Sequence, residues 1–337
     1  MTGAERIAEM LAAFDIGRVW CFPGGTISPL LDAIAKQGIE VIVARNEAGA
    51  GHMAQAAYRI SGKPQIVLVT SGPGCTNALT PLADAYFDGD AIVYLFGQVA
   101  TTSMRLDRPV RQRGFQEVDS IALARPISVA QFAPRTPEDL VQNVEAALNI
   151  CTQGRPGPAV VDCPMDLQRA ECRPHVGNII HHGGPSFELS RLRAAMDVLL
   201  DLETVVVCGR GVLGAADLLR QLIKLTRIEN AIDGWPVVCS MAAVGAIPSS
   251  WPEYKGMLGH TGHEDANAAI AMADALLVLG ARLDIRQTGT EVTDWDKKTV
   301  VWVNRDLDEL RHGRVKSVFS FWADCGEWLE QALTCLQ

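Results

Sequence analysis

The amino-acid sequence predicts an α/β protein of two domains, each with a parallel sheet flanked by helices. Short apolar runs alternate with segments of helical periodicity along the chain, which is the pattern of βαβ units. The 337 residues are long enough for two cores of ordinary size, and the alternation stops around 171–186, where Pro, His and Gly cluster. We therefore expect domains at 1–172 and 188–337, with a linker at 173–187.

The apolar runs and periodic segments place the individual elements. Strands of the first domain are expected at Val19–Phe22, Val41–Ala44, Gln65–Thr70, Ala91–Phe96, Ile127–Gln131 and Ala159–Asp162. Helices are expected at Thr2–Phe14, Ile27–Gln37, Ala48–Ser61, Thr76–Phe87 and Pro137–Thr152. The second domain, which we expect to be Rossmann-like, has a predicted helix at Glu188–Leu202 and predicted strands at Thr204–Cys208, Pro236–Cys239, Ala275–Leu279 and Thr299–Val303.

Composition excludes several classes of function. A net charge of −9 argues against a nucleic-acid partner, which needs clustered Lys and Arg. The nine cysteines are scattered and form no CxxC, so they indicate reduced thiols rather than a disulfide framework or a zinc site. The first residues lack the pattern of a signal peptide, and no apolar run approaches the roughly 18 residues of a membrane helix. We expect a cytoplasmic protein with no membrane partner.

Glycine-rich turns follow several predicted strands and therefore lie at the carboxyl ends of the sheets, where open α/β folds bind ligands. They include FPGGT (Phe22–Thr26), TSGPG (Thr70–Gly74) and GRGVLG (Gly209–Gly214). GRGVLG fits the GxGxxG pattern and is expected to open a helix, and Glu229 follows at the spacing of a dinucleotide site. This pattern keeps a nicotinamide-dependent dehydrogenase open beside a plain tight turn.

Two further groups of residues have competing interpretations. His260-x-x-His263-Glu264 resembles a metal pair but has no third ligand at metal spacing, so no metal site is predicted. Glu47 stands alone between an apolar run and a helix of small residues, RNEAGAGHMA. An acid there is either a first-turn residue favoured by the helix dipole or a catalytic carboxylate.

The turns occur together in one order: FPGGT, RNEAGAGHMA, LVTSGPGCTNALTPLADAY, GQV, GFQE and GRPGPAVVDCPMDLQ. This order and spacing resemble the acetolactate synthase branch of the thiamine-diphosphate enzymes, specifically over 1–170 and more loosely over 188–337. The first domain resembles the family's pyrimidine-binding domain. The second resembles its central domain, which holds FAD in acetolactate synthases.

The resemblance implies roles for individual residues. Glu47 matches the catalytic carboxylate that hydrogen-bonds the pyrimidine N1′ and favours the tautomer that takes up the C2 proton. Gly25 matches a backbone group near the reacting carbonyl, and Gln116 matches a residue that approaches the substrate. Implied contacts to thiamine diphosphate also include Pro23, Gly24, Gly72, Pro73, Asn77, Gln98 and Phe115. Implied contacts to FAD are Arg125, Gly209, Gly211, Arg282, Arg286 and Asp324.

Two departures weaken the implication of FAD. Asn304 stands where an acidic residue is expected, and the turn at Gly209 is Gly-Arg-Gly rather than three glycines. The GDG…N pattern of the family's diphosphate-binding domain, which holds Mg²⁺, is absent from these residues. We therefore expect an α-type subunit of a split enzyme, with a homodimer core in an α2β2 heterotetramer; a truncated chain is the other explanation.

The implied reaction is decarboxylation of a 2-keto acid followed by carboligation to an acyloin. Simple decarboxylation, as in sulfopyruvate decarboxylase, is the alternative within the class. A non-catalytic scaffold paralogue remains open beside the dehydrogenase.

Overall fold

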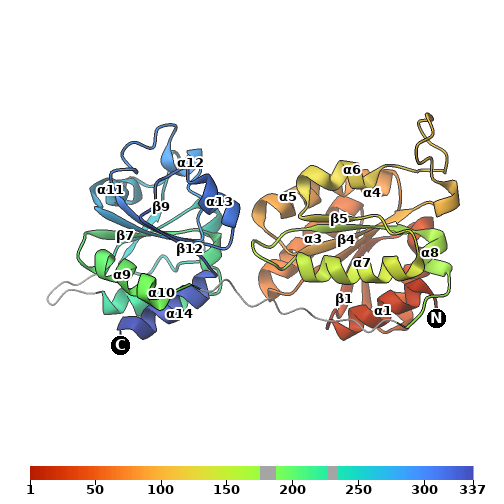
Figure 1. Ribbon diagram of the computed structural model, residues 1–337, viewed down its shortest axis with the longest axis horizontal. Coiled ribbons are helices and arrows are strands. Elements are labelled where there is room, and N and C mark those ends of the chain that lie inside the picture. The colour runs from red at the N-terminus through yellow and green to blue at the C-terminus, as the bar shows by residue number, and fades with distance from the viewer. Residues whose placement is uncertain (175–186, 227–233, 337) are drawn as a thin grey trace. The chain divides into compact units, whose positions relative to one another are not determined.

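The computed structural model describes residues 1–174, 187–226 and 234–336, and the chain divides into two compact units, Met1–His182 and Gly183–Gln337 (Figure 1). Each unit contains one six-stranded sheet in which every pair of neighbouring strands is parallel. The predicted fold class is confirmed. Residues 175–186 of the predicted linker and Glu229 lie outside the described residues.

The sheet of the first unit has the strand order β2-β1-β3-β4-β6-β5. Its strands are β1 Arg18–Phe22, β2 Glu40–Val43, β3 Gln65–Val69, β4 Ile92–Gln98, β5 Ala130–Phe132 and β6 Ala159–Pro164. β3 and β4 are buried along their whole length, which accounts for their near-continuous apolar sequences. The order reverses between β1 and β3, so the carboxyl ends of these strands mark the topological switch point where α/β folds bind ligands.

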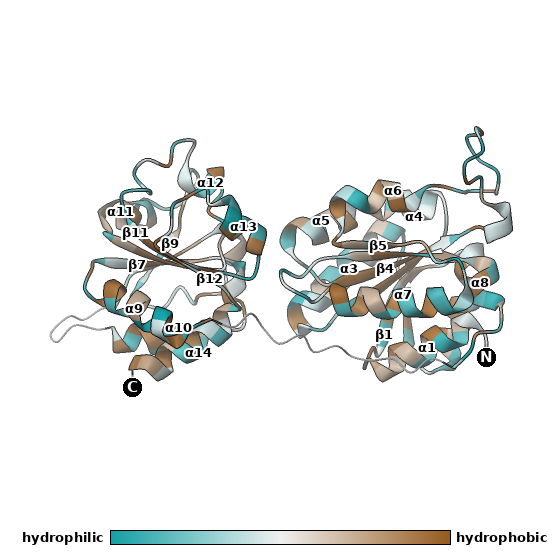
Figure 2. Cartoon of the chain, viewed as in Figure 1, coloured by the Kyte–Doolittle hydropathy of each residue, from teal (hydrophilic) through white to brown (hydrophobic). Residues whose placement is uncertain are grey.

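Helices cover both faces of this sheet (Figure 1). One face is covered by α1 Gly3–Ala13, α2 Ser28–Lys36, α7 Pro137–Ile150 and α8 Met165–Arg169. The other is covered by α3 Glu47–Ser61, α4 Pro73–Asn77, α5 Leu79–Asp88 and α6 Ser120–Ala124. Short 3-10 turns lie at Gly25–Ile27, Thr101–Ser103 and Arg125–Ile127. The apolar strands are enclosed between these two layers, as the hydropathy colouring shows (Figure 2).

The second unit has the strand order β9-β8-β7-β10-β11-β12, which is the Rossmann order 3-2-1-4-5-6. Its strands are β7 Thr204–Cys208, β8 Val237–Cys239, β9 Tyr254–Met257, β10 Ala275–Leu279, β11 Thr299–Asn304 and β12 Phe319–Trp322. Its helices are α9 Leu189–Leu200, α10 Ala216–Leu225, α11 Glu264–Met272, α12 Ile285–Thr288, α13 Leu307–His312 and α14 Cys325–Leu336, with 3-10 turns at Arg210–Val212 and Met241–Ala243. Among the described residues, no helix combines the length and apolarity that a membrane crossing requires.

Several elements differ from the sequence prediction. The edge strands β9 and β12 were not predicted, because their partly exposed sequences lack a long apolar run. The expected helix Thr76–Phe87 is instead two helices, α4 and α5, that meet at Ala78. The expected strand Ile127–Gln131 begins too early, since Pro126 lies in a 3-10 turn and the strand starts at Ala130. GRGVLG does not open a helix directly, because α10 begins only at Ala216.

Candidate active site

Four loops of the first unit leave the carboxyl edge of its sheet. They follow β1, β2, β3 and β4 and carry Pro23–Gly25, Glu47, Thr70–Gly74 and Phe115–Gln116 respectively. Parallel strands bring all four loops to the same edge of the sheet. The structure therefore gathers here most of the residues for which the sequence predicts contact with thiamine diphosphate.

Glu47 is the first residue of α3. Asn46 caps the helix, and its Oδ1 accepts a hydrogen bond of 2.6 Å from the Gly49 N–H. Glu47 is only 6% exposed, and its Oε2 accepts a hydrogen bond of 3.1 Å from Asn77 Nδ2. Its other oxygen, Oε1, has no donor among the described residues. Oε1 is not among the fully buried side-chain atoms that lack a partner, so it remains accessible and can accept a hydrogen bond from a bound ligand.

Small residues allow the elements around Glu47 to pack closely. A Cβ on Gly51 would lie 2.5 Å from Pro81 of α5, so α3 approaches α5 only because this residue is glycine. A Cβ on Gly74 would lie 2.7 Å from Thr70 Cγ2 and 3.5 Å from Glu47 Oε1. The two glycines therefore let Pro81 and Thr70 pack closely around the start of α3, which holds the Glu47 carboxylate in a fixed position.

Threonine side chains join the first two glycine turns. Thr26 Oγ1 lies 2.9 Å from Thr70 Oγ1 and accepts a hydrogen bond of 3.0 Å from the Ser71 N–H. A Cβ on Gly24 would lie 2.4 Å from Thr70 Cβ, whereas a Cβ on Gly25 would meet nothing within 4 Å. Gly24 is thus required by packing, while Gly25 faces open space at the edge of the sheet.

Gln116 and Phe115 lie in the loop after β4. Gln116 has a positive φ of 61°, and a Cβ on Gly72 would lie 2.8 Å from both the Cβ and the carbonyl oxygen of Gln116. The loop therefore packs directly on the turn Thr70–Gly74. Phe115 is 84% exposed, so the structure gives it no place in the core. Core packing therefore does not account for this aromatic side chain.

Gln98 is buried at the end of β4, where its side chain joins the loop after β4 to β6. Its Nε2 donates to the Val118 carbonyl at 2.9 Å and to Asp162 Oδ2 at 3.3 Å, and its Oε1 accepts from the Val99 N–H at 3.0 Å. Burial raises the pKa of Asp162 to about 6, although hydrogen bonds from Ser120 and Gln98 oppose the shift. The sequence analysis did not single out Asp162, because an acid at the end of a strand carries no signal of its burial.

The residues implied in FAD binding lie in two different units. Arg125 is in the first unit, at the 3-10 turn Arg125–Ile127. Gly209 and Gly211 follow β7. A Cβ on Gly209 would lie 2.2 Å from the Gly280 carbonyl oxygen, and a Cβ on Gly211 would lie 2.7 Å from the Gly280 Cα. These glycines are therefore needed for contact between the two turns at the switch point, with or without a nucleotide.

The remaining implied FAD contacts also lie at the carboxyl edge of the second sheet. Arg282 Nε lies 3.2 Å from Asp284 Oδ2, and Arg286 belongs to α12. Asp324 Oδ2 lies 3.6 Å from Arg305, and its Oδ1 accepts a hydrogen bond of 2.8 Å from the Gly326 N–H. Asn304 donates to the Ala281 carbonyl at 3.2 Å. The polar side chains at this edge are therefore held by hydrogen bonds and ion pairs to neighbouring residues of the same unit.

His263, one of the two histidines of the His260-x-x-His263-Glu264 motif, has a structural role. His263 Nδ1 accepts a hydrogen bond of 3.0 Å from the Met257 N–H. Within the part of the chain that the structure describes, no group of three or more His, Cys, Asp or Glu side chains could hold a metal ion.

Comparison with known proteins agrees with the geometry. Residues 1–123 match the N-terminal TPP binding domain of thiamine pyrophosphate enzymes, and residues 192–332 match the central domain of the same enzymes. The chain belongs to the thiamine pyrophosphate enzymes. Thiamine pyrophosphate is another name for thiamine diphosphate, so the resemblance deduced from the motifs is confirmed.

Relatives with a similar sequence include several acetolactate synthases. The chain is 34% identical over 305 residues to the mitochondrial acetolactate synthase catalytic subunit of Saccharomyces cerevisiae, covering 86% of the chain and 42% of the relative. It is 34% identical over 321 residues to the acetolactate synthase isozyme 1 large subunit of Escherichia coli, and the match covers 94% of the chain and 54% of the relative. It is 32% identical over 343 residues to the isozyme 3 large subunit of Escherichia coli, and this match covers 100% of the chain and 58% of the relative. The chain spans about half the length of the curated relatives it matches.

Proposed function

We propose that this chain supplies the pyrimidine-binding and central domains of a thiamine-diphosphate-dependent enzyme that decarboxylates a 2-keto acid and transfers the acyl unit to a second carbonyl. The observation that carries the proposal is the buried Glu47 carboxylate, which has one oxygen held by Asn77 and one oxygen without a donor among the described residues. A ring N–H of the cofactor is the kind of donor that the second oxygen lacks.

When bound, thiamine diphosphate supplies the carbanion that adds to the keto carbon and accommodates the charge released by loss of CO₂. Glu47 Oε1 would accept a hydrogen bond from the protonated N1′ of the pyrimidine, and in a site with little water this charge-assisted bond would be stronger. Asn77 holds the other oxygen at 3.1 Å and so fixes the direction of the carboxylate. Backbone N–H groups of the open turn at Gly25 stabilise negative charge on the substrate oxygen.

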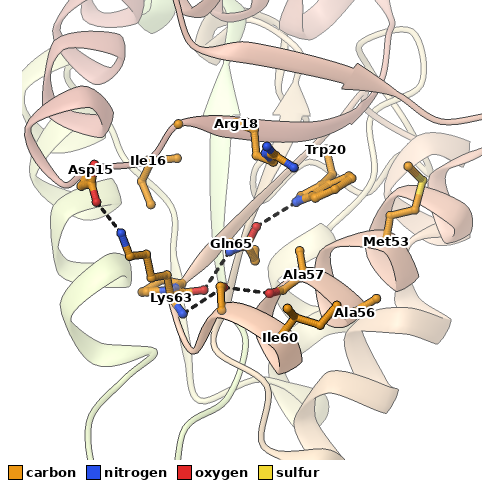
Figure 3. A pocket seen from close by; sticks show the side chains of 13 residues that line it. Asp15, Ile16, Arg18, Trp20, Met53, Ala56, Ala57, Ile60, Lys63 and Gln65 are labelled. Atoms are coloured by element: carbon orange, nitrogen blue, oxygen red, sulfur yellow. Dashed lines mark hydrogen bonds and ion pairs between the residues drawn. The ribbon is translucent and has the colours of Figure 1, made fainter.

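We propose that a partner subunit with a GDG…N diphosphate-binding domain completes the site and holds Mg²⁺. A separate surface lies at the amino edge of the sheet, away from Glu47, where Met53 and Ile60 of α3 line a hollow of about 790 Å³ together with Trp20 (Figure 3). Ile60 is 88% exposed, and the Lys63–Asp15 ion pair lies beside the hollow. An apolar surface on the helix that carries Glu47 is suited to a protein partner. We expect the assembly to be an α2β2 heterotetramer.

FAD in the second unit is a further part of the proposal. Its Rossmann strand order and the glycine turn at the switch point support a nucleotide there. The FAD would be structural, and purified protein should then show a flavin absorption spectrum that is lost on denaturation and gel filtration. A colourless protein that retains NAD(P) would instead favour the dehydrogenase.

The activity is tested by mixing this chain with a polypeptide that carries the GDG…N domain, thiamine diphosphate and Mg²⁺, and then measuring pyruvate consumption with several acceptors. We expect turnover only when all components are present, with an acyloin as product. An aldehyde product would instead establish the simple decarboxylase. No turnover of any 2-keto acid with any partner polypeptide would refute the proposed function.

A further inference from the structure

The loop between β4 and α6 carries a strong local positive charge. This arginine loop, Thr101–Glu117, holds four arginines within nine residues, against two acids, Asp107 and Glu117, so its formal net charge is +2. The chain as a whole has a net charge of −9. A basic cluster on an acidic protein concentrates anions at that part of its surface.

Carboxylates fix both ends of the arginine loop. At its start, the Thr101 N–H and hydroxyl donate to Asp166 at 3.0 and 2.5 Å. At its end, Glu117 accepts hydrogen bonds from the N–H groups of Arg105, Arg113 and Gly114 at 2.5, 2.9 and 3.2 Å. Burial opposes the effect, but these three donors hold the pKa of Glu117 below its ordinary value. The loop is therefore closed around a charged carboxylate and presents its arginines from a defined backbone.

The guanidinium groups are oriented by carbonyls rather than neutralised by acids. Arg113 donates to the Thr102 carbonyl at 2.5 Å, Arg105 to that of Val110 at 3.4 Å, and Arg108 to that of Met104 at 3.3 Å. Arg111 has no partner among the described residues, and none of the four forms an ion pair there. The acids of the loop and its flank are Asp107, Glu117 and Asp119. Positive charge thus remains for an external anion.

The arginine loop is continuous with the candidate active site. Gln116 packs on Gly72, and Gly74 of the same turn lies beside Glu47, where a Cβ would be 3.5 Å from Oε1. The loop also follows β4 at the carboxyl edge of the sheet, where Glu47 is located. An anion held by the loop is therefore held on the side of the unit where the chemistry is proposed.

We propose that the arginine loop recognises a second acidic group on the substrate, so that the preferred 2-keto acid is a dianion rather than pyruvate. The inference rests on the proposed function and names its substrate class. The single carboxylate of pyruvate is adjacent to the reacting carbonyl and needs a partner there. A carboxylate, sulfonate or phosphonate farther along the substrate matches the forked donors of arginine.

The test uses the complete enzyme, reconstituted with its diphosphate-binding partner, and compares kcat/KM for pyruvate, 2-ketoglutarate and sulfopyruvate. We expect at least one dianion to exceed pyruvate. The double variant Arg108→Gln/Arg111→Gln should lower kcat/KM for that dianion about tenfold and that for pyruvate less than threefold, because steering and pairing scale with substrate charge. Arg193→Gln, an exposed arginine of α9, makes the same type of change outside the loop and should leave both values unchanged.

A dianion-to-pyruvate ratio that is the same in the double variant and the wild type would overturn the inference, as would preference for pyruvate in the wild type. Turnover of no 2-keto acid at all would instead refute the proposed function. Tryptic cleavage of the complex after Arg111 gives a second readout that needs no turnover. Sulfopyruvate should slow this cleavage several-fold more than pyruvate does, and equal rates would count against recognition by the loop.

Discussion

Replacement of Glu47 by Gln changes one carboxylate oxygen to an amide at almost constant volume. Asn77 Nδ2 donates to Oε2 at 3.1 Å, so the new amide should turn its carbonyl oxygen toward Asn77. This orientation leaves an NH₂ group where Oε1 stood. A donor then faces the pyrimidine N1′ position, where the proposed chemistry needs an anionic acceptor.

The size of the effect follows from this geometry. Loss of a hydrogen bond to a charged group costs about 1.5–3 kcal/mol. The new amide NH₂ and the N–H of the pyrimidine would then face each other as two donors, which adds to that cost. At about 1.4 kcal/mol for each factor of ten, the rate should fall about 100- to 1,000-fold. The fold should change by less than about 1 kcal/mol, because the Asn77 bond persists and a buried charge is removed.

The assay is the initial rate of 2-keto acid consumption by the reconstituted enzyme at saturating thiamine diphosphate, with a thermal melt of each variant. Glu9→Gln, which alters a half-buried acid of α1 paired with Arg6 at 3.0 Å and distant in sequence from the candidate site, is the matched control and should keep the wild-type rate. A Glu47→Gln enzyme that melts normally and retains more than a third of the wild-type rate would refute the reasoning.

The remaining predictions concern glycines and one buried acid. Gly24→Ala should destabilise the first unit by about 1–3 kcal/mol through its clash with Thr70, whereas Gly25→Ala should not alter stability and should lower activity only, as urea titrations and rates can show. Gly209→Ala should lower the melting temperature of the second unit even in flavin-free protein, because its Cβ would meet the Gly280 carbonyl at 2.2 Å; an unchanged temperature would contradict this. Burial raises the folded-state pKa of Asp162 to about 6 because it penalises the charged carboxylate, so stability is highest below the unfolded pKa near 4, and about 3 kcal/mol of it is lost as pH rises through 6. Urea unfolding at pH 4 and 8 should show this slope in the wild type and not in Asp162→Asn.

The sequence predicted the alternation of strands and helices well, because buried parallel strands such as β3 and β10 are continuous apolar runs. It missed β9 and β12, which lie at the sheet edge with mixed exposure. It also placed Glu47 at the strand-to-helix junction, since strand ends are local features. It could not show which Glu47 oxygen lacks a donor, because that depends on Asn77, thirty residues away.

Other parts of the candidate site depended on tertiary contacts that no motif encodes. The sequence could not show that Gln98 donates a hydrogen bond to Asp162, or that Gly209 is required by Gly280. The roles of the arginines in 105–113 also depended on the structure, because a charged run alone does not reveal that carbonyls orient three of its guanidinium groups.

The central claim is that Glu47 activates thiamine diphosphate held together with a partner domain. Bound thiamine diphosphate exchanges its C2 proton for deuterium in deuterated buffer. Quenching the exchange at set times and recording proton NMR spectra measures this activation before any substrate is added. We predict fast exchange in the complex with wild-type chain, and exchange at least 100-fold slower with Glu47→Gln or with the partner alone. Equal exchange rates with wild-type and Glu47→Gln chains, at equal cofactor occupancy, would contradict the account.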